Sequence, residues 1–298
     1  MSQRDVKQRI DSVKNIRKIT SAMQMVAAAR LRRAEQRIAH LRPYAGAIRR
    51  MTRQAAEAAG GEVAGNPILQ EHEAERTIAI LLVTGDRGLA GAFNSQIIRA
   101  GLRAAEEYEA EGKSVHFYGV GRRGVSSLVF RKLELSGSYT GFTDRPAYAD
   151  ARRIAEDLMS AYVDGEVDRV EVFYNGYVSP LVQEVREEVL LPLQKATIDE
   201  AIADVADEEV LHHALVDYEP DPAVILQRLI PDYVEISLFR ALLESTASEH
   251  GARMTAMQSA SDNAGEVIED LTLEMNRARQ AEITQEIMEV VAGAESLS

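Results

Sequence analysis

The chain is 298 residues long, contains no cysteine and carries a formal net charge of −13. The missing cysteines exclude disulfides, thiolate metal sites and thiol-based redox switching. No apolar run reaches the roughly 18–20 residues that a membrane-spanning helix needs, and the first residues lack the apolar region typical of a signal peptide. Length and composition are those of a folded protein with room for one or two domains.

The charge is divided unevenly along the chain. Residues 1–53 contain fourteen Lys or Arg and three Asp or Glu, a net charge of +11, so the remainder carries −24. Residues 199–221 hold nine carboxylates and no Lys or Arg. A basic arm on an acidic protein indicates an anionic partner, either nucleic acid or an acidic protein surface. The same charges also suit the solvated faces of long helices, and charge alone leaves both interpretations open.

Residues 2–58 have the pattern of one long helix. Its apolar residues recur every three or four positions in two sets that are offset by one residue, and the offset rotates the buried stripe, so we expect no single straight seam. We expect Pro43 to bend the helix and the Gly- and Pro-containing segment 60–67 to end it. The two sets are Ile16, Ile19, Met23 and Val26, then Ala27, Leu31, Ala34, Ile38, Leu41, Ala45 and Ile48.

The period of the apolar pattern changes at residue 77. Residues 77–83 (TIAILLV) form a short, continuous apolar run, which is typical of a buried parallel strand. The alternation of strand and helix patterns that follows predicts a three-layer α/β domain of about 120 residues. Further strands are expected at 114–119 and 168–175, an antiparallel edge strand at 183–191, and helices from residue 94 to about 111, at 121–130 and at 148–163.

A heptad pattern runs through residues 233–291 over five repeats. At about 1.5 Å rise per residue, this helix would be roughly 85–90 Å long, too long for one globular domain to bury, so it needs a partner helix. The N-terminal helix supplies one, and the chain order makes the pair antiparallel. The seam consists of Leu243, Ala247, His250, Met254, Met257, Ser261, Ala264, Ile268, Leu271, Met275 and Ala278.

The predicted fold class is therefore α/β plus coiled coil. A long antiparallel two-helix coiled coil is formed by the N- and C-terminal helices, and a Rossmann-like α/β domain is inserted between them. The expected divisions are an N-terminal coiled-coil helix at 1–60, an α/β head domain at 75–195, an acidic linker at 196–222 and a C-terminal coiled-coil helix at 223–298.

The end of the C-terminal helix departs from the seam. After Ala278 the apolar positions shift by one residue and resume as Ile283, Ile287, Val290 and Ala294. The last turns are apolar around several faces, which is unusual for a free helix end. We expect this end to be enclosed.

One glycine pattern has the spacing of a nucleotide-binding site. Gly119, Gly121 and Gly124 fit GxGxxG between a predicted strand and helix, and Asp144 follows about twenty residues later. Three glycines at this spacing also make an ordinary tight turn. The segment GDRGLAG resembles a phosphate-binding loop but lacks the Walker A lysine, and adjacent His212 and His213 do not form a helical metal site. We expect no catalytic, cofactor or metal site on this chain.

Four segments, in order, resemble the gamma-subunit family of F-type ATP synthases over nearly the whole chain. They are IRKITSAMQMVAAARLRRA at 16–34, GDRGLAGAFN at 85–94, SEHGARMTAMQSASDNA at 248–264 and NRARQAEITQEIMEVVAGA at 276–294. The last contains the family pattern I-T-x-E-x-x-E-x-x-x-G-A. Ala90 stands where the family usually has cysteine, which indicates a packing position, and the inserted segment of the chloroplast and cyanobacterial forms is not apparent.

The resemblance implies a central-stalk rotor subunit that couples ion translocation to ATP synthesis or hydrolysis at the beta subunits. Met23 matches the family's coupling methionine, and Arg279, Gln280 and Thr284 match positions that hydrogen-bond a beta-subunit loop. Arg87 matches a head-loop position near the catalytic subunits. The basic N-terminal arm would then meet an acidic loop of beta.

The implied partners are the alpha3beta3 catalytic ring, the epsilon subunit and the membrane c-ring, with no nucleic acid, no cofactor and no transmembrane segment of its own. No transit peptide is apparent, so the expected location is the cytoplasmic face of a bacterial plasma membrane. The alternative is a coiled-coil protein that binds a nucleotide or nucleic acid.

Overall fold

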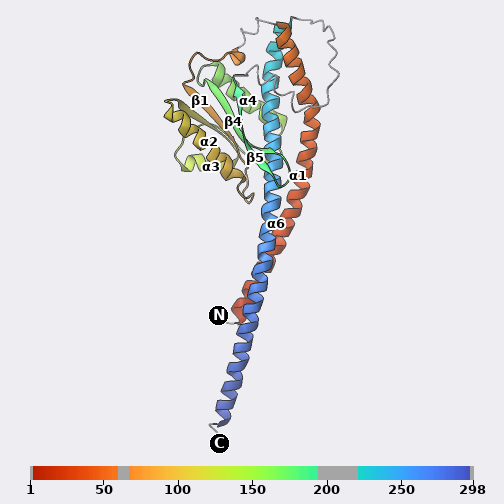
Figure 1. Cartoon of the computed structure of the whole chain (residues 1–298), viewed down its shortest axis with the longest axis vertical. Coiled ribbons are helices and arrows are strands. Elements are labelled where there is room, and N and C mark those ends of the chain that lie inside the picture. Colours follow the sequence, from red (N-terminus) through yellow and green to blue (C-terminus); the bar gives the residue numbers. More distant parts are fainter. Residues whose placement is uncertain (1–2, 60–66, 194–220, 296–298) are drawn as a thin grey trace. The chain divides into compact units, whose positions relative to one another are not determined.

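A computed structural model describes residues 3–59, 67–193 and 221–295 (Figure 1). Most of the acidic segment 199–221, with His212 and His213, lies outside these residues. The described chain forms two compact units: Arg30–Ala252 is one, and the parts of the long helices up to Ala29 and from Arg253 onward are the other. The elements are α1 (Gln3–Ala59), η2 (Pro67–Leu69), β1 (Thr77–Val83), α2 (Phe93–Ala110), β2 (Ser114–Val120), α3 (Arg122–Phe130), β3 (Leu135–Tyr139), α4 (Tyr148–Val163), β4 (Arg169–Tyr177), β5 (Gln183–Leu191) and α6 (Pro222–Glu295).

A five-stranded sheet organises the unit Arg30–Ala252. Its strand order is β3-β2-β1-β4-β5, with β1 in the middle. Strands β1 to β4 are parallel, and β5 pairs antiparallel with β4, as the sequence predicts for the edge. The sequence pattern misses β3 because its residues, LSGSY, include neither a β-branched residue nor an apolar run. Pairing with β2 holds these residues in the sheet.

Helices cover both faces of the sheet, because successive side chains of a strand point to opposite sides. On β1, Ile78, Ile80 and Leu82 pack against α2 and α3, whereas Ala79 and Leu81 join α4, α1 and α6 on the other face. All five side chains are fully buried. The expected three-layer α/β domain is confirmed, and the long helices form part of its second helical layer.

Helix α6 begins eleven residues before the heptad pattern does. Pro222 occupies its first turn, where a missing N–H costs little, and the Asp221 carboxylate accepts a hydrogen bond from the Ala223 N–H at 2.8 Å. The helix then continues through Pro231. An internal proline costs about 3 kcal/mol, and burial of the neighbouring Ile230 and Val234 in the core offsets this cost.

In the unit formed by the helix ends, α1 and α6 pack antiparallel. Val6 and Ile10 of α1 contact Leu271 of α6, whereas Arg17, farther along α1, lies against Gly265. The predicted seam of α6 is confirmed, since all eleven of its positions from Leu243 to Ala278 are buried or half-buried.

The predicted seam of α1 is wrong in its first half. Ile16, Ile19 and Val26 are 52%, 59% and 53% exposed. The buried positions instead follow one heptad phase without a one-residue step, and polar residues occupy some of them, such as Thr20. The buried positions of this phase include Val6, Ile10, Thr20, Ala27, Leu31, Ala34, Ala45, Ile48, Thr52 and Ala55. An apolar stripe of α1 is thus left uncovered by α6.

Candidate partner-binding surfaces

The loop between β1 and α2 is built around the carboxylate of Asp86. This carboxylate accepts hydrogen bonds from the backbone N–H groups of Gly141 (2.9 Å), Thr143 (3.2 Å) and Arg122 (3.1 Å), and from the Thr143 hydroxyl (3.0 Å). Asn94 accepts a further bond from the Gly85 N–H at 2.8 Å. The loop is therefore fixed by three other segments of its own unit.

The fixed loop presents Arg87 and Leu89 to solvent. Both side chains are exposed, and Leu89 has a positive φ of 61°. Ala90, next in the chain, is buried in the cluster beneath α2, which agrees with the packing role expected for this position. The buried Ala90 thus holds the loop against α2, while Arg87 and Leu89 face solvent. Arg87, the predicted site residue, is therefore accessible to a partner.

Titration of Asp86 should appear in the stability of the protein. Burial raises the pKa of this carboxyl. The N–H and hydroxyl donors of Gly141, Thr143 and Arg122 together lower the pKa by more, so its net direction is down. Because the unfolded state then binds more protons, the stabilisation is present above about pH 4 and is lost as the pH falls through the folded-state pKa. We expect the free energy of unfolding of the wild type to exceed that of Asp86→Asn at pH 7, with a smaller gap at pH 3. A gap that stays constant in urea titrations at both pH values would contradict this account.

The GxGxxG glycines serve chain packing. Gly121 has φ of 86°, and a Cβ there would collide with the carbonyl oxygen of Thr84. A Cβ on Gly124 would lie 2.7 Å from the Thr84 hydroxyl oxygen, which accepts a hydrogen bond from the Gly124 N–H. The first backbone N–H groups of α3, which a nucleotide-binding protein of this pattern would direct at a phosphate, instead donate to Asp86, Gly85 and Thr84.

Asp144, the acidic residue expected to follow a nucleotide-binding turn, has a different role here. It forms an ion pair with Arg30 of α1 at 2.5 Å and lies 3.7 Å from Nε2 of His250 on α6. Asp144 therefore links the two long helices to the sheet domain. In the nucleotide-binding alternative, the glycine turn and Asp144 would both contact the nucleotide. Here the glycines pack against Thr84 and Asp144 pairs with Arg30.

The packing role of Gly121 predicts a large loss of stability for Gly121→Ala, of about 3 kcal/mol or more, because positive φ and steric overlap combine. Gly165 is a matched control, since its φ is also positive, at 73°, and its Cβ position is open. We expect Gly165→Ala to cost only about 1 kcal/mol in the same urea titration. Equal costs would show that overlap with Thr84 is unimportant.

The same loop fastens α6 to the sheet domain. A Cβ on Gly85 would lie 2.7 Å from the carboxyl carbon of Glu249, so a larger residue at position 85 would displace this carboxylate. The Thr246 hydroxyl donates to the Thr143 carbonyl at 3.0 Å. Glu249 therefore meets the loop that carries Arg87, and Thr246 meets the segment that anchors Asp86 of that loop.

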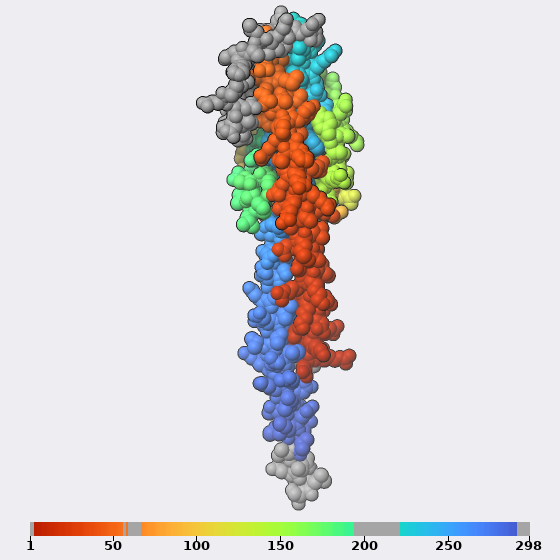
Figure 2. All heavy atoms as spheres, turned by 90° about the vertical axis from the view of Figure 1, so that its right-hand side faces the viewer, coloured from red at the N-terminus to blue at the C-terminus, as the bar shows by residue number. Residues whose placement is uncertain are grey.

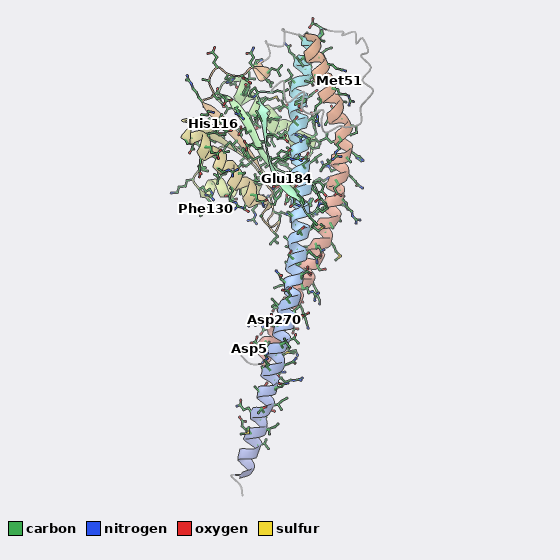
Figure 3. The ribbon with its side chains drawn as sticks, in the orientation of Figure 1. Asp5, Met51, His116, Phe130, Glu184 and Asp270 are labelled. Atoms are coloured by element: carbon green, nitrogen blue, oxygen red, sulfur yellow. The ribbon has the colours of Figure 1, made fainter. Side chains whose placement is uncertain are left out.

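The last described turns of α6 have no cover within their unit. Every described side chain from Arg279 to Val290 is exposed, including Ile283, Ile287 and Met288. Antiparallel pairing explains this exposure. Val6, in the first turns of α1, lies at the level of Leu271, so the later turns of α6 have no neighbouring turn of α1. Figure 3 labels Asp5, in the first turns of α1, and Asp270 of α6. The expectation that another molecule encloses this end fits the geometry.

The predicted site residues of this unit lie at two places. Arg279, Gln280 and Thr284 are exposed on neighbouring turns of α6, and the Thr284 hydroxyl donates to the Gln280 carbonyl at 2.8 Å. Met23 is half-buried on α1. Since Arg17 lies beside Gly265, Met23 is roughly 20 residues, or about 30 Å, from Gln280 along the helix pair.

Sequence reasoning missed a surface next to Met23. The exposed stripe of Ile16, Ile19 and Val26 follows the same flank of α1 and adds apolar area to it. Figure 2 looks onto α1, in red to orange. The sequence does contain the true seam as a single heptad phase on the adjacent face of α1. Polar residues such as Thr20 occupy some of its positions, so the apolar pattern does not show it.

Two further observations concern metal ions and membranes. Among the residues that the structure describes, no three His, Asp or Glu side chains lie close enough together to hold a metal ion. None of the described helices is long and apolar enough to cross a membrane.

The fold and these surfaces define a class of protein: an α/β domain packed against long antiparallel helices that carry exposed apolar side chains. A family model described as ATP synthase matches residues 2–297. The chain belongs to this family, and within it to the ATP synthase gamma chains, as its relatives show.

The relatives match over almost their full length. An ATP synthase gamma chain of Rubrobacter xylanophilus is 44% identical over 297 residues, covering 100% of this chain and 99% of the relative. A gamma chain of Anaeromyxobacter sp. is 43% identical, with 99% of each chain covered. The chain also resembles a solved chain from the central stalk and c-ring of the Tetrahymena thermophila mitochondrial ATP synthase, with a TM-score of 0.60, 26% identity, and 82% and 99% of the two chains covered. A chain of the Euglena gracilis enzyme (TM-score 0.66, 15% identity, 99% and 94% covered) shares the fold.

Proposed function

We propose that this chain is the central-stalk rotor subunit of an ATP synthase, which couples ion translocation in the membrane sector to ATP synthesis or hydrolysis at the beta subunits. The exposed apolar end of α6 is the structural observation that carries the proposal. A rotor turning inside a ring needs a helix end that its own chain leaves bare. The chain is a non-catalytic subunit, so it transmits torque and the chemistry takes place on its partners.

The partner-facing residues divide between the two units. Met23, Arg279, Gln280 and Thr284 contact the alpha3beta3 ring, with the apolar stripe beside Met23 enlarging the contact. Arg87 contacts the same ring from the unit of the sheet. The net charge of +11 on residues 1–53 suits acidic surfaces of the beta subunits. The epsilon subunit and the membrane c-ring are the remaining partners.

Torque transmission requires that the helix pair resist twisting and that it stay attached to the sheet domain. The heptad seam supplies the first property, since each buried position locks α1 against α6. The contacts of Glu249 with Gly85 and of Asp144 with Arg30 supply the second. The complex is membrane-associated, and its place is the cytoplasmic face of a bacterial plasma membrane.

Met23→Lys tests the coupling role. The substitution adds a cation where an acidic partner loop is expected, and an added ion pair would disturb the contact that couples rotation of this chain to the beta sites. We expect the assembled enzyme to retain ATP hydrolysis while ATP-driven ion pumping falls several-fold. The measurement is the ratio of pumping to hydrolysis in reconstituted vesicles.

Met25→Lys is the matched control, because Met25 is exposed and lies two residues away on a different face of α1. Its pumping-to-hydrolysis ratio should stay near that of the wild type. Equal losses of pumping and hydrolysis in Met23→Lys, or no loss of either, would refute the coupling role of this position.

A further inference from the structure

A groove of about 670 Å³ lies within the unit Arg30–Ala252, between α1, the β4–β5 hairpin and α6. In Figure 2 the hairpin, in green, borders α1. This volume is within the range of small-molecule sites. Five arginines and one carboxylate line the groove: Arg42, Arg49, Arg50, Arg186, Arg240 and Glu244. The net positive charge of residues 1–53 includes three of these arginines, but general attraction to an acidic surface does not require guanidinium groups to line a groove.

One wall of the groove is already neutralised. Arg240 pairs with Glu188 at 2.6 Å and with Glu244 at 3.4 Å, and Arg186 pairs with Glu244 at 3.0 Å. Two arginines and two glutamates therefore compensate one another on this side. Beyond the wall, Glu35 accepts a hydrogen bond from the hydroxyl of Tyr177, another lining residue.

The opposite wall carries the charge excess. Arg42, Arg49 and Arg50 come from one flank of α1, and the seven-residue spacing of Arg42 and Arg49 places these two side chains on the same face, two turns apart. Arg50 folds back over Gly46, with Nη1 3.6 Å from the position that a Cβ there would take. No carboxylate of the described residues forms an ion pair with Arg42 or Arg49. Even with Glu35 counted, the groove keeps a positive excess.

The rest of the lining is apolar and includes Ile38, Leu41 and Leu243. Guanidinium groups bind phosphate bidentately, and an apolar wall beside them accommodates a hydrocarbon body. We propose that this groove binds a phosphate monoester with a small apolar substituent, its phosphate on Arg42 and Arg49 and its apolar part on Ile38 and Leu41. None of the five individual residues assigned to the ring lines this groove. The proposal does not depend on the proposed function.

Calorimetric titration of the full chain with hexyl phosphate, inorganic phosphate and hexanol tests this site. We expect hexyl phosphate to bind at least tenfold more tightly than inorganic phosphate, and hexanol to give no measurable binding. The variant Arg42→Gln/Arg49→Gln should weaken hexyl phosphate binding at least tenfold. Ile38→Ala should weaken hexyl phosphate and leave inorganic phosphate unchanged.

The matched control is Arg99→Gln/Arg103→Gln, which removes the same charge from exposed positions of α2 in the same unit. Circular dichroism melts establish that each variant is folded. Absence of hexyl phosphate binding, or equal weakening by both double variants, would overturn the proposal. The proposal would also be overturned if Arg42→Gln/Arg49→Gln bound hexyl phosphate normally but associated more weakly with another subunit. That result would assign the groove to an acidic protein segment.

Discussion

The double substitution Ile283→Asp/Ile287→Asp is expected to weaken binding of the chain to the alpha3beta3 ring by about 100-fold or more. The two side chains are 47% and 56% exposed within their own unit, so the folded chain loses little when they change. Enclosed by a partner, each isoleucine would contribute about 1–2 kcal/mol through burial, and each carboxylate would add a desolvation cost. The measurement is the dissociation constant of the complex between the chain and the alpha3beta3 ring, determined by passing the ring over the immobilised chain.

Val163→Asp controls for the general effect of adding a carboxylate. Val163 is an exposed apolar residue at the end of α4, outside the surfaces assigned to the ring. Its substitution should change the dissociation constant less than about threefold. If the double variant binds the ring as tightly as the wild type, the end of α6 is not enclosed and the assignment of Arg279, Gln280 and Thr284 fails with it.

Arg240→Met is expected to lower the free energy of unfolding by about 1–3 kcal/mol, because the partly buried carboxylates of Glu188 and Glu244 each lose a charged hydrogen-bond donor. Arg240 is 28% exposed in its side chain and holds Glu188 on β5 and Glu244 on α6. Its Nη1 also donates to the Tyr174 hydroxyl at 3.3 Å. Burial lowers the pKa of Arg240, but the neighbouring Tyr174, Glu188 and Glu244 raise it, and the net direction is up. The folded protein therefore stabilises the charged form.

Arg103→Met is the control for this prediction. Arg103 also pairs with a glutamate, Glu107 at 3.8 Å, but the two side chains are 76% and 69% exposed. Ion pairs on the surface contribute about 0–1 kcal/mol, so we expect a small change in the same urea titration. Similar losses for the two variants would show that the contact of β5 with α6 does not depend on this network.

The sequence predicts most of the fold because its patterns are strong where burial is complete. The apolar run of β1 and the heptads of α6 each admit one interpretation. It fails where the environment, and not the local pattern, decides the structure. Strand β3 depends on pairing with β2, and the first turns of α6 continue through Pro231 because the core holds them. Local propensity contains neither fact.

The candidate surfaces are predictable in part. The apolar end of α6 is visible in the sequence as a broken seam, and the structure leaves that end bare. The apolar spacing of Ile16 and Ile19 predicts that they face α6, whereas the structure exposes them and buries Thr20 instead. The choice of Met23, Arg87, Arg279, Gln280 and Thr284 came from resemblance, since an exposed side chain carries no physical mark of the partner it meets. Their roles remain predictions.

The most direct test of the rotor role is to mix the chain with alpha and beta subunits and to measure complex formation and ATP hydrolysis, beside the chain alone. The account predicts a stable complex that hydrolyses ATP over many turnovers, and no hydrolysis by the isolated chain. Hydrolysis by the chain alone, or failure to join the ring, would contradict the central claim.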